Sequence, residues 1–132
     1  MLKKIFYQKI LIKEKSMEPT LKDGDFITMK KIFFKYKVKR FDLILFNFEN
    51  RNYIKRVIGV KNETIESLNG NILINGVELK ENYLRNKNNF NFPKIKLKKN
   101  EIYVLGDNRK ISKDSRDFGP VKVKNILSFY RV

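Results

Sequence analysis

Two Asn-Gly dipeptides, Asn69-Gly70 and Asn75-Gly76, lie close together and are flanked by short runs containing Ile, Leu or Val at 65–68, 72–74 and 77–79. Because Asn and Gly readily adopt the left-handed backbone of tight hairpin turns, each dipeptide predicts a reversal between two antiparallel strands. Short apolar runs separated by polar turns recur along the chain. The sequence therefore predicts a mainly β fold, an antiparallel and partly closed barrel or sandwich.

The chain length limits the number of domains. With 132 residues the chain can build one core, and its hydrophobic content of 42% favours a packed fold over disorder. We expect a single domain over 1–132, with a short hairpin and loop insertion around 62–100. Within it, the Asn- and Lys-rich stretch 82–100 is typical of an irregular surface loop.

A serine at position 16 opens the run SMEPTL at 16–21, where a hydroxyl is followed by an apolar side chain and a chain-bending proline. A serine hydroxyl is a weak nucleophile unless a neighbouring base accepts its proton. The chain has no histidine, and the absence of cysteine excludes both a thiol nucleophile and a cysteine metal site. A lysine or a carboxylate remains, and Ser-Lys pairs are a known form of this chemistry.

Lys55 is the lysine whose surroundings best suit that role. It lies in the run 52–60, whose β-branched and aromatic residues predict a strand, and the period of two places it on one face with Tyr53 and Val57. Burial on that face, together with the charge of Arg56, is expected to lower the lysine pKa from its usual value of about 10.4. A shift of about three units would provide a neutral base at pH 7.

A polar loop at 106–116 follows the predicted strand 102–105 and carries hydroxyls and charges together. Ser112 or Ser115 could hold a buried amine in line with the nucleophile. The carboxylates of this loop could also stiffen it by forming ion pairs with arginines. The acidic residues are Asp107 and Asp114, and the candidate partners are Arg56, Arg109 and Arg116.

These stretches, in this order, resemble the motifs of bacterial type I signal peptidase, the membrane-bound Ser-Lys endopeptidase that removes signal peptides from exported proteins. The run 16–21 is similar to the nucleophile motif of that family, 53–59 to its lysine motif, and 106–108 followed by 112–116 to its C-terminal motif. The resemblance implies a catalytic domain of the signal peptidase fold. It also implies preprotein signal peptides as substrates, the extracytoplasmic face of a bacterial membrane as location, and no metal or cofactor.

Site roles follow from the resemblance position by position. It implies Ser16 as nucleophile, with its backbone N–H in the oxyanion hole, Lys55 as general base, and Ser112 as the hydroxyl that orients the lysine. The expected supports of the site are Asp114, Arg116, Arg56 and Asp107.

The sequence departs from the family pattern at three places. Glu14 stands two residues before the nucleophile, where the family often has a small or hydroxyl residue, and a carboxylate cannot donate a hydrogen bond to an oxyanion. Removal of one such donor lowers the rate by about 10²- to 10³-fold. The stretch 60–63 replaces a Pro-Gly-Asp turn, for which we expect a turn of altered shape. Third, members of the family carry a transmembrane helix before the nucleophile, whereas residues 1–15 contain no apolar run long enough to span a bilayer and no signal-peptide pattern. We interpret these residues as a first strand or as a basic interfacial segment.

The chain has a formal net charge of +16, which favours partners with a negatively charged surface. It favours an anionic membrane surface as a partner, and a separate membrane-anchoring partner is a further alternative. An AT-rich coding sequence also explains abundant lysine. The lysines are spread along the chain, which argues against a dedicated nucleic-acid binder. The stretch 30–40 interleaves aromatic residues with cations and could form an exposed hairpin, contact lipid headgroups or stack on bases.

Two other classes of function stay open from the sequence. A self-cleaving domain of the LexA type shares the Ser-Lys chemistry, although residues 1–15 are too short for a helix-turn-helix. A catalytically impaired homologue would instead act as a basic membrane-surface binding protein.

Overall fold

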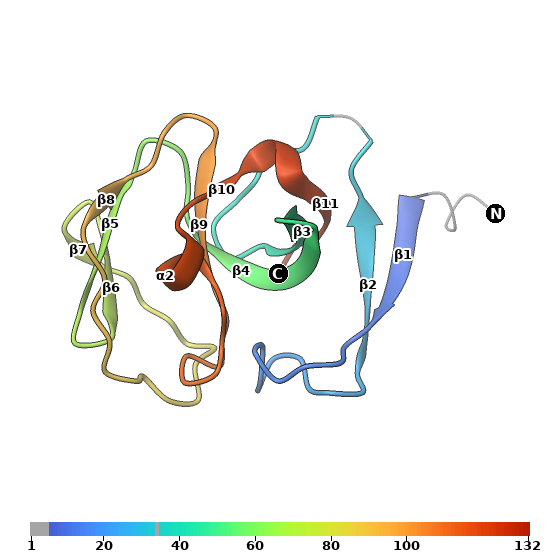
Figure 1. The fold of residues 1–132 in the computed structure, drawn as a ribbon, viewed down its shortest axis with the longest axis horizontal. Coiled ribbons are helices and arrows are strands. Elements are labelled where there is room, and N and C mark those ends of the chain that lie inside the picture. Colours follow the sequence, from blue (N-terminus) through green and yellow to red (C-terminus); the bar gives the residue numbers. More distant parts are fainter. Residues whose placement is uncertain (1–5, 34) are drawn as a thin grey trace.

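The computed structural model describes residues 6–33 and 35–132 (Figure 1). Of the stretch 1–15, residues 1–5 therefore lie outside the described residues, as does Phe34. The predicted mainly β class is confirmed. In chain order the elements are β1 (Tyr7–Leu11), β2 (Phe26–Lys31), β3 (Leu43–Phe48), β4 (Arg51–Gly59), β5 (Thr64–Leu68), β6 (Asn71–Ile74), β7 (Val77–Glu78), β8 (Ile95–Lys96), β9 (Glu101–Leu105), α2 (Ser115–Phe118), β10 (Val121–Lys122), the 3-10 helix η1 (Val123–Asn125) and β11 (Ile126–Tyr130).

The strands form two antiparallel sheets. One has seven strands in the order β1-β2-β11-β3-β4-β9-β10, and the other has four in the order β7-β6-β5-β8. Figure 1 shows the four-stranded sheet on the left, with β9 and α2 between it and the rest of the seven-stranded sheet. Within the described residues the larger sheet keeps β1 and β10 as open edges, so its antiparallel architecture matches the prediction but no closed barrel forms.

The hairpin turns follow the local sequence. Asn69 and Gly70 have positive φ angles of 51° and 84°, and Asn75 and Gly76 have 50° and 81°. These are the left-handed conformations that a two-residue turn between antiparallel strands requires. Both predicted Asn-Gly turns are therefore confirmed.

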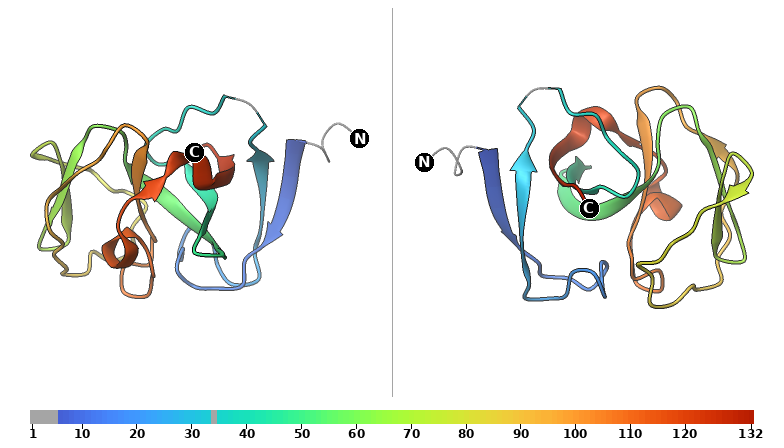
Figure 2. Two further views of the ribbon diagram at one scale, coloured as in Figure 1. Left: turned by 45° about the horizontal axis from the view of Figure 1, so that its top comes forward. Right: turned by 180° about the vertical axis from the view of Figure 1, so that it is seen from behind.

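The stretch 30–40 does not form the exposed hairpin that was one interpretation of it. β2 and β3 flank this stretch in the sequence, but β11 lies between them in the sheet and pairs with both. The views in Figure 2 agree in placing β11 there. The connection from β2 to β3 consequently crosses one end of the sheet instead of reversing into a neighbouring strand.

A cluster of buried aliphatic side chains fixes the segment around Ser16. Ile12, Met17 and Leu21 come from this segment, and they pack against side chains of three strands: Ile27 and Met29 of β2, Leu43 and Leu45 of β3, and Ile54 of β4. Met17 is only 2% exposed. The serine that precedes Met17 is thus anchored to the core by its neighbour in the sequence.

Candidate active site

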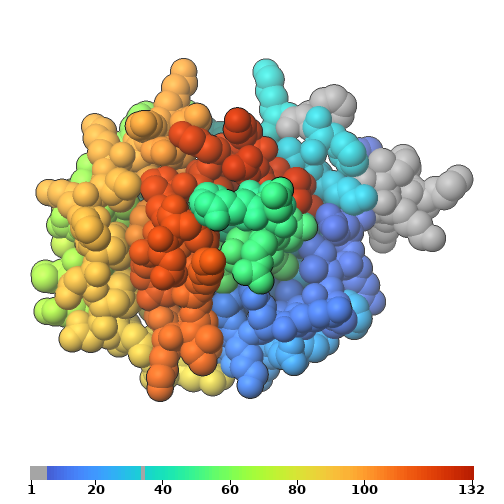
Figure 3. Space-filling view, in the orientation of Figure 1, coloured from blue at the N-terminus to red at the C-terminus, as the bar shows by residue number. Residues whose placement is uncertain are grey.

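The Ser16 segment is held from two sides. Met17 is in the core, and the Leu21 N–H donates to the Met17 carbonyl at 2.9 Å. On the other side, the Ser16 carbonyl accepts a hydrogen bond from the Asn108 N–H at 2.9 Å. Figure 3 shows the blue N-terminal segment and the orange segment after β9 lying against each other on the surface. Loop 106–116 therefore meets the serine, as its motif predicts.

Lys55 reaches Ser16 from the middle of β4. Its Nζ lies 2.6 Å from the Ser16 Oγ, and the lysine is 1% exposed. Burial lowers the pKa of the Lys55 amine below its usual value, Glu14 and Asp114 act in the opposite direction, and the charge of Arg116 lowers it further. The pair predicted from the sequence is thus within hydrogen-bonding distance, and its amine is biased towards the neutral form that a base requires.

Glu14 is the third member of this group. The Ser16 hydroxyl donates to Glu14 Oε1 at 2.6 Å, and the same oxygen lies 3.7 Å from Lys55 Nζ. The glutamate side chain is 56% exposed, in contrast to the buried lysine. The residue that departs from the family pattern therefore contacts both members of the Ser-Lys pair.

Asp114 organises the loop beside the pair. Its Oδ2 accepts hydrogen bonds from the Ser112 hydroxyl at 2.7 Å and the Gly106 N–H at 2.9 Å, while Oδ1 accepts from Arg116 Nε at 2.9 Å. The Ser112 hydroxyl thus bonds to a carboxylate in this structure and not to the Lys55 amine. The other serine considered for orienting the lysine, Ser115, accepts the Val104 N–H at 2.9 Å and so supports β9.

Gly106 is needed for the close approach of this loop to the nucleophile. A Cβ atom at this position would overlap Ser112 Oγ and lie 2.6 Å from the Ser16 carbonyl oxygen. Only glycine, which lacks that atom, fits between the two serines.

Arg56 and Asp107 form a buried ion pair behind the site. Arg56 donates to the two carboxylate oxygens of Asp107 at 2.9 and 2.7 Å, and the Thr20 hydroxyl also donates to Asp107. Burial is the largest cause of the lowered Lys55 pKa, and the cation that adds to it is Arg116. The sequence analysis expected a neighbouring positive charge to lower the Lys55 pKa, and in the structure Arg116 supplies that charge in place of Arg56.

Arg109 has a partner that sequence reasoning missed. Its guanidinium pairs with Glu81 at 2.5 Å, and both side chains are buried. Glu81 comes from the irregular stretch after β7, and nothing in its local pattern distinguishes it from the exposed acids. Only the tertiary fold brings this carboxylate to loop 106–116.

Ser16 also supplies an unused donor. In the described part of the chain, no hydrogen bond uses the Ser16 backbone N–H. A hydroxyl, a buried amine and a free N–H at one bent edge are the parts that acyl transfer needs: nucleophile, base and oxyanion donor.

Comparison with known proteins identifies the family. The family model described as "Signal peptidase, peptidase S26" matches residues 1–131. The chain belongs to this signal peptidase family. Similar proteins include signal peptidase I P of Bacillus subtilis subsp. natto, 35% identical over 130 residues, which cover 89% of this chain and 70% of that protein. Signal peptidase I of Leptolyngbya laminosa is 35% identical over 127 residues, which cover 88% of this chain and 63% of that protein.

A solved structure of a signal peptidase supports the fold. The crystal structure of a signal peptidase I from Enterococcus faecalis V583 matches with a TM-score of 0.66 and 31% identity, covering 73% of this chain and 98% of that chain. The family of serine proteases expected from the motifs at 16–21, 53–59 and 106–116 is confirmed. Among the described residues, no helix has the length and apolar composition needed to cross a membrane.

The second departure from the signal peptidase pattern, at 60–63, still forms a turn. The Glu63 N–H donates to the Val60 carbonyl at 3.2 Å, and Asn62 has a positive φ of 66°. The Glu63 carboxylate accepts the Val60 N–H at 2.8 Å and pairs with Arg40 at 2.7 Å. Side-chain bonds from one glutamate thus hold a turn that has no proline or glycine.

Proposed function

We propose that this chain is a serine endopeptidase that removes signal peptides from exported preproteins through a Ser16-Lys55 pair. The observation that supports the proposal most directly is the 2.6 Å separation between a buried amine and a fixed hydroxyl. Membership of the signal peptidase family supports preproteins as substrates. Ser112, Asp114, Arg116, Arg56 and Asp107 act as supports of the site.

The reaction is acyl transfer. Neutral Lys55 accepts the Ser16 proton as the hydroxyl oxygen attacks the scissile carbonyl, and the Ser16 N–H stabilises the oxyanion. The resulting ammonium of Lys55 donates its proton to the leaving amine. In the second half of the reaction Lys55 accepts a proton from water as the water oxygen attacks the acyl carbonyl. The bond between that carbonyl carbon and the Ser16 oxygen then breaks, and the Lys55 ammonium returns its proton to the Ser16 oxygen.

An apolar groove next to Ser16 fits an extended peptide. It has a volume of about 340 Å³, and its walls include Ile10 and Ile12 on one side and Leu45 and Ile54 on the other. In the described part of the chain β1 pairs with β2 alone, so its outer edge carries free backbone donors and acceptors. A substrate strand can pair with this edge while its side chains enter the groove.

Cleavage of a preprotein in detergent tests the proposal. The wild type should release a signal peptide whose mass places the cut at one defined bond, and Ser16→Ala should release none. Equal cleavage by the two proteins would overturn the proposal. Cleavage of the chain itself, without cleavage of the preprotein, would favour a self-cleaving domain. Absence of both, with membrane binding retained, would favour an impaired homologue.

The pH dependence of cleavage should reveal the lowered pKa of Lys55. Because the neutral amine is the base, kcat/KM should rise with pH through the Lys55 pKa and reach a plateau above it. Because burial lowers the pKa of the Lys55 amine, this midpoint should lie below the usual lysine pKa of 10.5. A pH series of kcat/KM, with circular dichroism at each pH to monitor folding, measures it. A rate that still rises in proportion to hydroxide up to pH 10.5 would contradict a buried lysine base.

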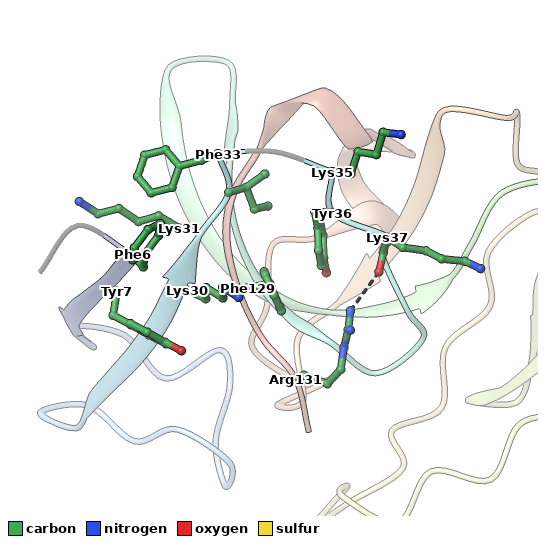
Figure 4. A pocket seen from close by; sticks show the side chains of 11 residues that line it. Phe6, Tyr7, Lys30, Lys31, Phe33, Lys35, Tyr36, Lys37, Phe129 and Arg131 are labelled. Carbon is green, nitrogen blue, oxygen red and sulfur yellow. Dashed lines mark hydrogen bonds between the residues drawn. The ribbon is translucent and has the colours of Figure 1, made fainter. Parts of the chain in front are cut away.

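We also propose that the domain contacts an anionic membrane through a basic and aromatic pocket on the β2 side of the large sheet. The pocket has a volume of about 450 Å³, and five cations line it: Lys30, Lys31, Lys35, Lys37 and Arg131. Phe6 and Phe33, which are 37% and 52% exposed, pack edge to face at its rim. In Figure 4 the Lys31, Lys35 and Lys37 side chains extend outward from the pocket. Cations around exposed aromatic side chains are typical of surfaces that contact lipid headgroups.

Replacing Lys31, Lys35 and Lys37 together by glutamine should weaken binding to anionic vesicles. Each lysine near such a surface contributes about 1 kcal/mol, so the loss should be on the order of 10²-fold. Sedimentation with phosphatidylglycerol vesicles at several salt concentrations measures it. A matched triple variant removes the same charge elsewhere, at the exposed residues Lys80, Lys87 and Lys110. Equal losses in the two variants would show that net charge alone, and not this pocket, drives binding.

A further inference from the structure

The single hydrogen of the Ser16 hydroxyl is directed at Glu14. A hydroxyl has one hydrogen to donate, and in this structure Glu14 Oε1 accepts it at 2.6 Å. The Lys55 amine, also 2.6 Å from Oγ, must then be the donor in its own contact with the serine. This arrangement is the reverse of the one that general-base catalysis requires, where the lysine accepts the serine proton.

Glu14 also opposes the effect of burial on Lys55. Burial lowers the pKa of the amine, whereas the negative charge of Glu14, 3.7 Å away, raises it. The other charged groups that face the amine are Asp114, which raises the pKa, and Arg116, which lowers it; the Tyr53 ring centre lies 6.0 Å away. Glu14 is thus one of two carboxylates that favour the ammonium form, and of these two it is the exposed one.

The surroundings of Glu14 allow it to move. Its side chain is 56% exposed and it lines the apolar groove beside Ser16, between β1 and Met17. Asp114, in contrast, is fully buried and bound by Ser112, Gly106 and Arg116. A peptide that enters the groove therefore meets Glu14 at the nucleophile, and rotation of this one side chain frees the Ser16 hydroxyl.

We propose that Glu14 is a positioning residue that latches Ser16 and Lys55 in a resting arrangement, and that a peptide bound in the groove releases the latch. The inference rests on the proposed peptidase function. In the resting arrangement the serine hydrogen is held by the carboxylate and the lysine is kept as a donor. Displacement of the carboxylate turns the hydroxyl towards the amine and removes the nearby negative charge that favours the ammonium.

The first test measures Lys55 directly and requires no activity. The midpoint of the Lys55 Nζ titration is followed by NMR on isotope-labelled protein, and the resonance is assigned by its loss in Lys55→Met. Glu14→Gln should lower this midpoint by about one pH unit, because an opposite charge a few ångströms away shifts a pKa by about 1–3 units and half exposure reduces the effect. Glu18→Gln removes a carboxylate from the turn that begins at Ser16, and it should leave the Lys55 midpoint unchanged.

The second test separates a latch from a merely structural role. In the wild type only the protein molecules with a displaced Glu14 side chain can bind substrate productively. The apparent affinity for substrate is therefore the intrinsic affinity multiplied by the fraction of such molecules. Glu14→Ala, which removes the hydrogen-bond acceptor as well as the charge, should lower KM several-fold and move the rising limb of the pH-rate profile to lower pH. Glu14→Ser, with a small side chain that can donate to an oxyanion, should show both effects and in addition raise kcat.

The possible results distinguish the two proposals. An unchanged Lys55 midpoint in Glu14→Gln would overturn the latch, whatever the cleavage results. A lower midpoint with unchanged KM in Glu14→Ala would overturn release by the substrate. A lower midpoint in a protein that cleaves no preprotein, with or without Glu14, would overturn the peptidase function and leave the contact of Glu14 with the pair established.

Discussion

Replacing Lys55 by methionine should lower kcat/KM for preprotein cleavage by on the order of 10⁴-fold or more, as expected when the base of a hydrolytic pair is removed. Methionine retains most of the volume of the lysine stem within β4, but it cannot accept the Ser16 proton. The lysine is buried and lies 2.6 Å from the Ser16 hydroxyl, so methionine at this position removes the buried base and leaves the surrounding side chains packed. Steady-state kinetics with a purified preprotein measure the loss.

Lys55→Arg distinguishes a base from a fixed positive charge. Arginine keeps the charge but stays protonated, since its pKa exceeds about 12. It should therefore be as inactive as Lys55→Met. The double variant Ser16→Ala/Lys55→Met should lose no more activity than either single variant, because the two side chains act as one unit. Activity of Lys55→Arg within tenfold of the wild type would show that the amine acts by its charge alone.

Local signals in the sequence were sufficient for several features of this fold. The Asn69-Gly70 and Asn75-Gly76 turns depend on backbone preferences of the residues themselves, so they could be predicted without the structure. The turn between β3 and β4 is a tight one. Glu49 and Asn50 alone adopt positive φ angles, and the strand begins at Arg51. Non-glycine residues in this conformation give a weaker signal, because tertiary pairing of the strands enforces it.

The order of the strands in the large sheet could not be predicted from local sequence signals. β11 pairs with β2 and β3, although residues 126–130 lie far from both in the sequence. No residue of the stretch 30–40 indicates that another strand will enter at this point. Pairings of this kind depend on how the whole sheet packs, and the closest sequence evidence for them was the resemblance to a family with a known fold.

The site could be predicted as a set of motifs but not in its hydrogen bonds. Period-two alternation and the SMEPTL run placed Lys55 and Ser16 as candidates, and the structure brings them together. The sequence could not show that the Ser112 hydroxyl bonds to Asp114, since a rotation about one bond decides the partner. Nor could it show that Glu14, noted only as a missing oxyanion donor, would point at Ser16.

The buried ion pair behind the site should dominate the stability of this region. Asp107→Ala is expected to lower the free energy of unfolding by about 3–5 kcal/mol, the usual effect of leaving one charge of a buried pair uncompensated. The Arg56 and Asp107 side chains are 3% and 0% exposed, and two hydrogen bonds join them. A domain of this size has a free energy of unfolding of about 5–15 kcal/mol, so the variant should lose a large fraction of its stability. Urea unfolding followed by circular dichroism measures the change.

Two controls determine whether the uncompensated charge is the cause. Glu66→Ala removes a carboxylate whose partner, Lys94, is 67% exposed, and it should lower the free energy of unfolding by less than about 1 kcal/mol. The double variant Arg56→Met/Asp107→Leu removes both charges and fills their volume, so it should recover most of the stability that Asp107→Ala loses. If the double variant were as unstable as Asp107→Ala, the loss would come from hydrogen bonds to this carboxylate, including that of Thr20, and not from a buried unpaired charge.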